Sequence, residues 1–150
     1  MDGDTIYVAI GNQIEKVRYI GINTPEIHHP TKGREPYGEV AREANVRLVD
    51  GRWVDLVLDV QAGDRFGRLL AYVYVGGRFV NADLVWQGYA EAATYPPNVR
   101  YADYFVGLLQ RHAREARHGL WADPDAISYH RPRPPDYAAE QPQLPAAHSR

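Results

Sequence analysis

The sequence contains no cysteine, which excludes disulfide bonds, zinc sites built on thiolates and a thiol nucleophile. It also lacks any apolar run of the roughly 18 residues needed to cross a bilayer, so no membrane partner is predicted. Basic residues are not in excess, because 17 Lys and Arg are set against 19 Asp and Glu, for a net charge of −2. This balance disfavours a protein that coats nucleic acid through a broadly basic surface, but not an enzyme that grips one phosphate.

What is present is the composition of a folded globular domain, with 45% hydrophobic and 24% charged residues. The length suits one ordinary domain. From Arg131 onward aliphatic residues become few, and five prolines occur before the end of the chain. We therefore predict one domain over residues 1–122 and a proline-rich, disordered tail over residues 123–150.

Hydrophobic periodicity and turn residues predict an α+β fold with a mainly β core. Five short strands closed in Greek-key order would form an OB-fold barrel, whose open face binds nucleic acids or sugars. Periodicity alone does not choose between a general α+β arrangement and such a small barrel with helices packed on its outside. The predicted strands cover Thr5–Ile10, Ile14–Ile22, Trp53–Val60, Arg68–Val75 and Arg78–Val80. The predicted helices cover Gly38–Val49, a short segment through Gln87 that Asn81 can cap, and Tyr101–His118.

Three short segments concentrate charge where a fold rarely needs it, and the first is Asp2-Gly3-Asp4-Thr5. Two carboxylates around a glycine at the start of a strand are a typical donor arrangement for a hard cation such as calcium or magnesium. A turn in which an aspartate binds its own backbone explains the same residues. Taken alone, the segment favours the turn.

The second segment runs from Arg18 to Glu26. By strand alternation Arg18 shares a face with Ile20 and Ile22, and a guanidinium among apolar neighbours needs a partner anion or an open cleft. Just downstream, Asn23 offers an amide oxygen, Thr24 a carbonyl and Glu26 a carboxylate. A partly exposed arginine in a structural ion pair is the alternative.

The third segment is Asp64-Arg65-Phe66-Gly67-Arg68. The glycine permits a bend that aims Arg68 away from the strand ladder. A plain hairpin turn with solvated charges is the commoner outcome for such a pentapeptide.

Together the three segments can serve phosphodiester hydrolysis. Two arginines, Arg18 and Arg68, can bind phosphoryl oxygens by bidentate hydrogen bonds. Glu26 can act as general base toward water, and a bound metal can polarise the phosphoryl group. The predicted catalytic residues are thus Arg18, Glu26 and Arg68, and the predicted metal ligands are Asp4, Asn23 and Thr24.

The order Asp-Gly-Asp-Thr, then Val-Arg-Tyr-Ile-Gly-Ile-Asn-Thr-Pro-Glu, then Asp-Arg-Phe-Gly-Arg-Leu-Leu-Ala-Tyr-Val-Tyr, closing on Gly119-Leu120-Trp121, resembles the staphylococcal nuclease (thermonuclease) family. The resemblance runs from Asp2 to about Trp121. It implies a five-stranded OB-fold barrel with three helices and calcium-dependent cleavage of DNA and RNA by a monomer. It also implies that Arg18 and Arg68 bind phosphate, that Glu26 is the general base, that Asp4 and the Thr24 carbonyl bind Ca²⁺, and that Arg65, Phe66 and Tyr95 contact substrate.

The sequence departs from the family pattern at several points. Asn23 stands where the family has aspartate, which predicts weaker calcium binding. Phe66 replaces a common tyrosine, and Tyr95 alone remains of a tyrosine-rich segment. Family members also have a strand before the Asp-Gly-Asp turn, so we expect that strand to be missing here. A signal peptide lost with it would indicate a secreted or cell-envelope protein, and otherwise a cytoplasmic one is expected.

Other candidate sites are weaker. His28 and His29 are adjacent on a predicted loop and are better explained as solvated than as metal ligands. The apolar stripe of Tyr101, Tyr104 and Phe105 predicts core packing rather than base stacking. Arg111, Arg114 and Arg117 predict a solvated helix face. The alternative function is a non-catalytic binding module of the same fold, in which the arginines or the glutamate are usually replaced.

Overall fold

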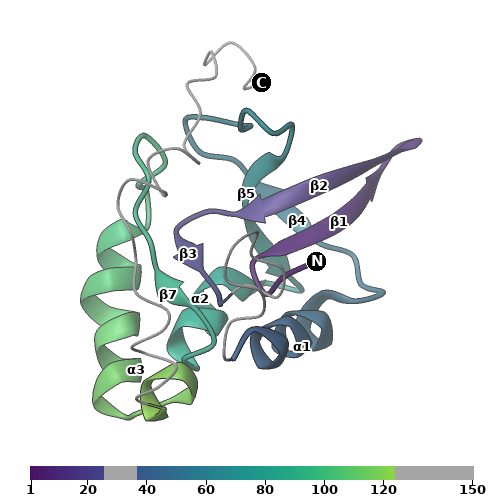
Figure 1. The fold of residues 1–150 in the computed structure, drawn as a ribbon. Helices are drawn as coiled ribbons and strands as arrows, with labels where there is room; N and C mark the ends of the chain where they lie inside the picture. The colour runs from purple at the N-terminus through teal and green to yellow at the C-terminus, as the bar shows by residue number, and fades with distance from the viewer. Residues whose placement is uncertain (26–36, 124–150) are drawn as a thin grey trace.

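The computed structural model describes residues 1–25 and 37–123, and all statements about structure refer to these residues. Their elements follow one another as short strands with helices between them (Figure 1). In chain order the elements are β1 (Thr5–Ile10), β2 (Gln13–Tyr19), β3 (Ile22–Asn23), α1 (Gly38–Val49), β4 (Asp55–Val57), β5 (Leu69–Val75), β6 (Arg78–Phe79), α2 (Val80–Trp86), β7 (Glu91–Ala92), a π-helix (Tyr104–Gln110) continued by α3 (Arg111–Glu115), and a 3₁₀ turn (Gly119–Ala122).

The main sheet is mixed and curls into half a barrel. Its strand order is β1-β2-β5-β4, with β6 paired to β5, while β3 and β7 form a separate two-stranded sheet. β1 and β2 make an antiparallel hairpin that projects from the body (Figure 1). β2 then runs parallel to β5, with Val17 opposite Leu69 and Arg18 opposite Leu70. This one parallel pairing joins two segments that are some fifty residues apart in the sequence.

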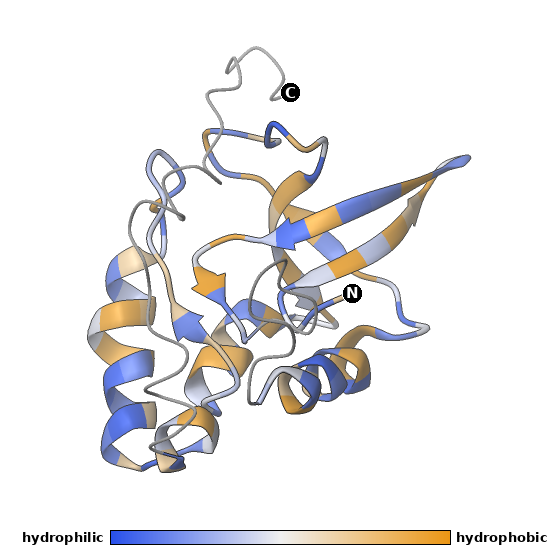
Figure 2. Cartoon of the chain, viewed as in Figure 1, coloured by the Kyte–Doolittle hydropathy of each residue, from blue (hydrophilic) through white to orange (hydrophobic). Residues whose placement is uncertain are grey.

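The core lies between the sheet and the helices. Val17, Tyr19, Val73 and Leu84 are fully buried there, and Figure 2 shows hydrophobic segments in orange along the strands and α2. Figure 2 also shows mixed blue and orange along α1 and the last helix, as expected of helices with one face on a core. The α+β class with a mainly β core is confirmed.

Several predicted bounds were wrong, and at two of them contacts with distant segments are seen. The second strand ends at Tyr19 because Gly21 turns the chain with φ of +82°, and Phe105 packs so closely that a Cβ at Gly21 would lie 2.6 Å from its ring. α2 begins at Val80, so Asn81 is no cap. Instead the Asn81 amide is buried and bridges the sheet to the loop, accepting from the Val73 N–H and donating to the Ile20 carbonyl.

The two outer strands of the sheet, β1 and β4, flank a groove of about 690 Å³ lined by residues 6–11 and 49–54.

Within the described ranges, no helix has the length and apolarity required to cross a membrane. The predicted tail, apart from Asp123, lies outside the described residues, and so does Glu26.

Candidate active site

Arg18 and Arg68 are brought together by the pairing of β2 with β5. Arg18 lies opposite Leu70, and Arg68 is only two residues before Leu70 in the sequence. Both arginines line one pocket of about 20 Å³, which is room for about one water molecule. The pocket wall also contains Asp64, Tyr95 and Asn98. The two arginines predicted to bind phosphate therefore share one site.

The guanidinium group of Arg18 is buried and held by the turn that follows its own strand. Its Nη1 donates to the carbonyl oxygens of Tyr19 and Ile22, both at 2.9 Å. Its Nη2 donates to Asn23 Oδ1 at 3.2 Å and lies 3.5 Å from Asp4 Oδ2. The partner anion expected for this buried arginine is thus Asp4, and the neighbouring carbonyls fix the direction of the group.

Asp4 connects the first turn of the chain to the end of β3. Its Oδ2 accepts the backbone N–H of Thr24 at 3.0 Å, and its Oδ1 accepts the Thr5 hydroxyl at 3.1 Å. Gly3 presses the turn against α1, where an added Cβ would lie 2.9 Å from the Cβ of Ala41. The glycine of the Asp-Gly-Asp motif therefore allows a close backbone approach that sets the position of Asp4.

The residues predicted to bind a metal, Asp4, Asn23 and Thr24, are all buried and lie together. They offer only oxygen donors, which suit hard cations. Thr24 is fully buried, and its hydroxyl has no hydrogen-bond partner among the described residues, which is a feature of sites that lack a bound group. These residues fit a hard divalent cation. The described part of the chain has no cluster of three or more His, Cys, Asp or Glu side chains suited to a metal, so few of the available ligands are charged.

Arg68 lies immediately before β5, at the end of a turn that Asp64 closes. The Asp64 N–H donates to the Arg68 carbonyl, the Gly67 N–H donates to the Asp64 carbonyl, and both distances are 3.0 Å. Gly67 has φ of +80°, which a side chain would strain. Arg68 Nε donates to Asp64 Oδ2 at 2.7 Å. Asp64 was not predicted as a site residue, although an aspartate four residues before an arginine with a glycine between them was a readable signal.

The residues predicted to contact substrate lie in two loops. Phe66 is 58% exposed at the tip of the 64–68 turn. The guanidinium carbon of Arg65 lies 4.9 Å from the centre of its ring, and that of Arg68 lies 5.3 Å away. Tyr95 is half-buried and lines the pocket beside Arg18. Only Tyr95 of the three is a wall of the pocket.

Asn98 ties the loop that carries Tyr95 to the segment before Asp64. It accepts the backbone N–H of Gln61 and donates its own amide N–H to the Gln61 carbonyl, both at 2.8 Å. Because both loops line the pocket, this reciprocal pair fixes the distance between its walls. Sequence analysis did not identify Asn98, and nothing local in the sequence indicated its partner.

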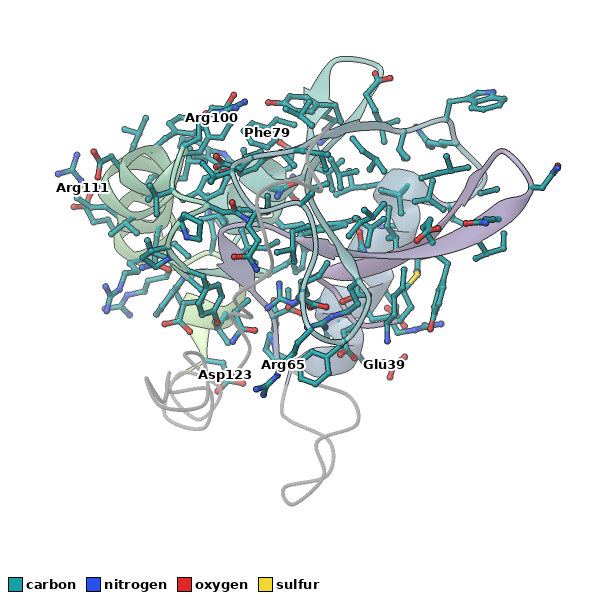
Figure 3. The ribbon with its side chains drawn as sticks, turned by 90° about the horizontal axis from the view of Figure 1, so that it is seen from above. Glu39, Arg65, Phe79, Arg100, Arg111 and Asp123 are labelled. Atoms are coloured by element: carbon teal, nitrogen blue, oxygen red, sulfur yellow. The ribbon has the colours of Figure 1, made fainter. Side chains whose placement is uncertain are left out.

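The weaker candidates are placed away from this site or outside the described residues. His28 and His29 fall in the second group, together with Glu26. Phe105 is buried, as predicted for core packing, and it packs on Phe79. The same prediction was wrong for Tyr104, whose side chain is exposed. Figure 3 shows Phe79 and Arg100 on the side of the molecule opposite to Arg65. The ring of Phe79 packs against the aromatic rings of Tyr72, Tyr74, Tyr101 and Phe105.

With this geometry in view, the chain can be compared with known proteins. The family model described as staphylococcal nuclease homologue matches residues 16–123, which is well over half of the chain. The chain belongs to this family. The expected OB fold is thereby confirmed, since the curled half-barrel with three helical segments is the form that this family takes here.

Curated relatives of the chain include three bacterial enzymes. It is 40% identical over 124 residues to the SPbeta prophage-derived endonuclease YokF of Bacillus subtilis, which covers 81% of this chain and 42% of YokF. It is 39% identical to the endonuclease YncB of the same organism over 81% of this chain and 58% of YncB. Similarity to the thermonuclease of Staphylococcus intermedius is 36% identity, over 81% of this chain and 71% of that enzyme. The chain spans about half the length of the first two relatives.

Proposed function

We propose that this protein is a calcium-dependent nuclease that hydrolyses phosphodiester bonds of DNA, RNA or both. The observation that supports it most directly is the meeting of Arg18 and Arg68 at one pocket, where Asp4 and Asn23 contact Arg18 and the Thr24 backbone N–H donates to Asp4. Relatives named endonuclease and thermonuclease support the same reaction class. The non-catalytic module gives no reason for two buried or half-buried arginines to converge.

The two arginines have different tasks in this proposal. Arg18 is rigid, because its terminal nitrogens are committed to Tyr19, Ile22 and Asn23, so it supplies a fixed positive charge beneath the phosphate. Arg68 is bound to Asp64 through Nε alone, and its two terminal nitrogens have no hydrogen-bond partner among the residues that the structure describes. Those nitrogens can form the bidentate contact that a phosphoryl group requires.

A divalent cation held by Asp4, Asn23 and the Thr24 carbonyl would polarise the phosphoryl group when bound. The chain's own residues do the rest. Arg18 and Arg68 stabilise the charge that grows on the phosphoryl oxygens. Glu26, which lies outside the described residues, is proposed to take the proton of the attacking water. Tyr95 stands beside the arginines as a surface on which a base can stack.

The test is cleavage of heat-denatured DNA by the whole chain, with millimolar calcium and then with EDTA. Cleavage is expected to stop on chelation and to return when calcium is restored. Arg68→Lys is the informative variant, because lysine cannot make the bidentate contact and because Arg18 also holds the fold together. Its kcat should fall about 10²- to 10³-fold.

The matched control is Arg78→Lys, since Arg78 is exposed and pairs with Asp83 away from the pocket. It should leave kcat unchanged. Cleavage that continues in EDTA would refute the calcium dependence. An intact protein that binds denatured DNA without cutting it at millimolar calcium would instead favour the non-catalytic module.

A further inference from the structure

The carboxylate of Asp64 is one of the most buried charged groups at the pocket, with its side chain 1% exposed against 18% for Arg68. Burying a carboxylate is costly unless hydrogen bonds compensate for the lost water. Asp64 Oδ1 accepts the backbone N–H groups of Phe66 and Arg68, both at 3.0 Å, and Oδ2 accepts Arg68 Nε at 2.7 Å. Each oxygen thus has a separate task.

Oδ1 closes the turn, because its two donors belong to the backbone. Oδ2 orients a side chain, because its donor is the inner nitrogen of a guanidinium. A guanidinium is planar and presents its donors in a fixed fork. Binding at Nε therefore fixes the plane of the group and leaves Nη1 and Nη2 of an arginine that lines the same pocket as Arg18 for another acceptor.

We propose that Asp64 is a positioning residue for the reaction, holding the Arg68 guanidinium in the orientation in which its terminal nitrogens meet the phosphate. The inference rests on the proposed function. Without Asp64 Oδ2, Arg68 would have to give up rotational freedom with every substrate, which slows the chemical step rather than weakening the fold. Asp64 itself does not touch the substrate.

Asp64→Asn separates the two tasks of the carboxylate. An asparagine keeps an oxygen that can accept the two backbone N–H groups, so the turn can still close. Its amide nitrogen is a donor and cannot accept from Arg68 Nε. The matched control is Asp83→Asn, which makes the same change in the exposed Arg78–Asp83 pair.

The experiment measures kcat and KM on denatured DNA with calcium for the wild type, Asp64→Asn, Arg68→Ala and the double variant, with thermal unfolding of each. Asp64→Asn should lower kcat by up to about 10²-fold, with KM and the unfolding temperature nearly unchanged, while Asp83→Asn behaves as wild type. In the Arg68→Ala background the Asp64 change should have almost no further effect, because coupled residues do not act additively.

A second readout does not depend on activity. The Nε–Hε signal of Arg68 in NMR should show an ordered group in the wild type and a mobile one in Asp64→Asn. Full activity of Asp64→Asn, an additive loss in the double variant, or an unchanged Arg68 signal would each overturn the inference while leaving the nuclease proposal intact. A wild type that does not cleave DNA would refute the proposed function, and with it the role of Asp64 in catalysis.

Discussion

The Arg18 side chain shows how one residue can be both structural and chemical. Its nitrogens contact two carbonyls and one amide in the segment that follows β2 and, at 3.5 Å, the carboxylate of Asp4 in the first turn of the chain. Burying an arginine this deeply is unfavourable unless each donor finds an acceptor. The same contacts that satisfy Arg18 therefore fix where Asp4 and Asn23 lie. A phosphate charge and a cation would be placed side by side by one set of hydrogen bonds.

Asn23 should limit the affinity for calcium. Its Oδ1 is a neutral ligand that also accepts from Arg18 at 3.2 Å, and calcium affinity rises with the charge of the ligands. Asn23→Asp is expected to lower the Kd for calcium about tenfold, or about 1.4 kcal/mol, as measured by isothermal titration calorimetry. Asn12→Asp, at the exposed hairpin turn, adds the same charge elsewhere and should have no such effect. Equal affinities of wild type and Asn23→Asp would contradict the prediction.

At the scale of elements, the site depends on how two turns are pressed against helices. The ring of Phe105 lies where a side chain at Gly21 would be, and Ala41 of α1 lies where a side chain at Gly3 would be. The first contact lets β3 leave the line of β2, and the second sets the turn that carries Asp4. Both positions require glycine for more than backbone flexibility, because a neighbouring element fills the space that a side chain would occupy.

Gly3→Ala should therefore damage both stability and calcium binding. The new Cβ would lie 2.9 to 3.0 Å from three atoms of Ala41, two of them backbone, and overpacking of this kind costs about 1–3 kcal/mol. Urea unfolding should show that loss, and calcium titration a weaker site. Gly107→Ala is the control, because nothing lies within 4 Å of its Cβ position, and alanine is the better helix former. It should be neutral or stabilising, and a Gly3→Ala protein as stable as the wild type would disprove the packing argument.

The elements that sequence analysis predicted correctly are those whose signals are local. The bounds of β1 and α1 agree with the prediction, because alternation, helical spacing and turn residues lie within each segment. β7 was missed since Glu91 and Ala92 form a strand only through their pairing with β3. Asn81 looked like a cap, but its partners Ile20 and Val73 lie far away in the sequence.

The same distinction applies to the candidate site. The charged motifs were visible because each is a short run, and the pairing of β2 with β5 then brought Arg18 and Arg68 to one pocket. The residues that support the arginines and the walls of the pocket were not predicted from the sequence. The Asn98 side chain hydrogen-bonds to the backbone of Gln61, and no residue pattern encodes such a contact. Asp64 belongs to the charged segment of residues 64–68, yet its role depends on the contact between its Oδ2 and Arg68 Nε.

At the scale of the whole molecule, buried tyrosines connect the sheet to its surroundings and make stability depend on pH. Burial raises the pKa of Tyr19, with Asp4 adding to the effect, although its hydroxyl donates to Asn45 Oδ1 at 2.5 Å. Burial also raises the pKa of Tyr72, whose hydroxyl donates to Asp59 at 2.6 Å. Burial and the hydrogen bond with Tyr101 raise the pKa of Tyr74 to about 12. All three phenols are held in the protonated form by the fold.

These shifts predict loss of stability in alkali. The unfolded chain releases phenolic protons near pH 10, whereas the folded chain retains them, so the unfolded state binds fewer protons and stability falls as pH rises. The contribution is fully present below about pH 10 and is lost as the pH rises toward the folded pKa values. Tyr74 should lose its contribution first among the three, because only its pKa is as low as about 12.

The urea midpoint should be flat from pH 7 to 9 and decrease above pH 10. Tyr19→Phe should reduce the slope of that decrease, by at most about 1.4 kcal/mol per pH unit, whatever it costs at neutral pH. Tyr7→Phe, at an exposed position of β1, removes a hydroxyl without that burial and should leave the slope as it is. If Tyr19→Phe and the wild type lose stability in parallel above pH 10, then the interior does not hold Tyr19 protonated, and the alkaline transition has another origin.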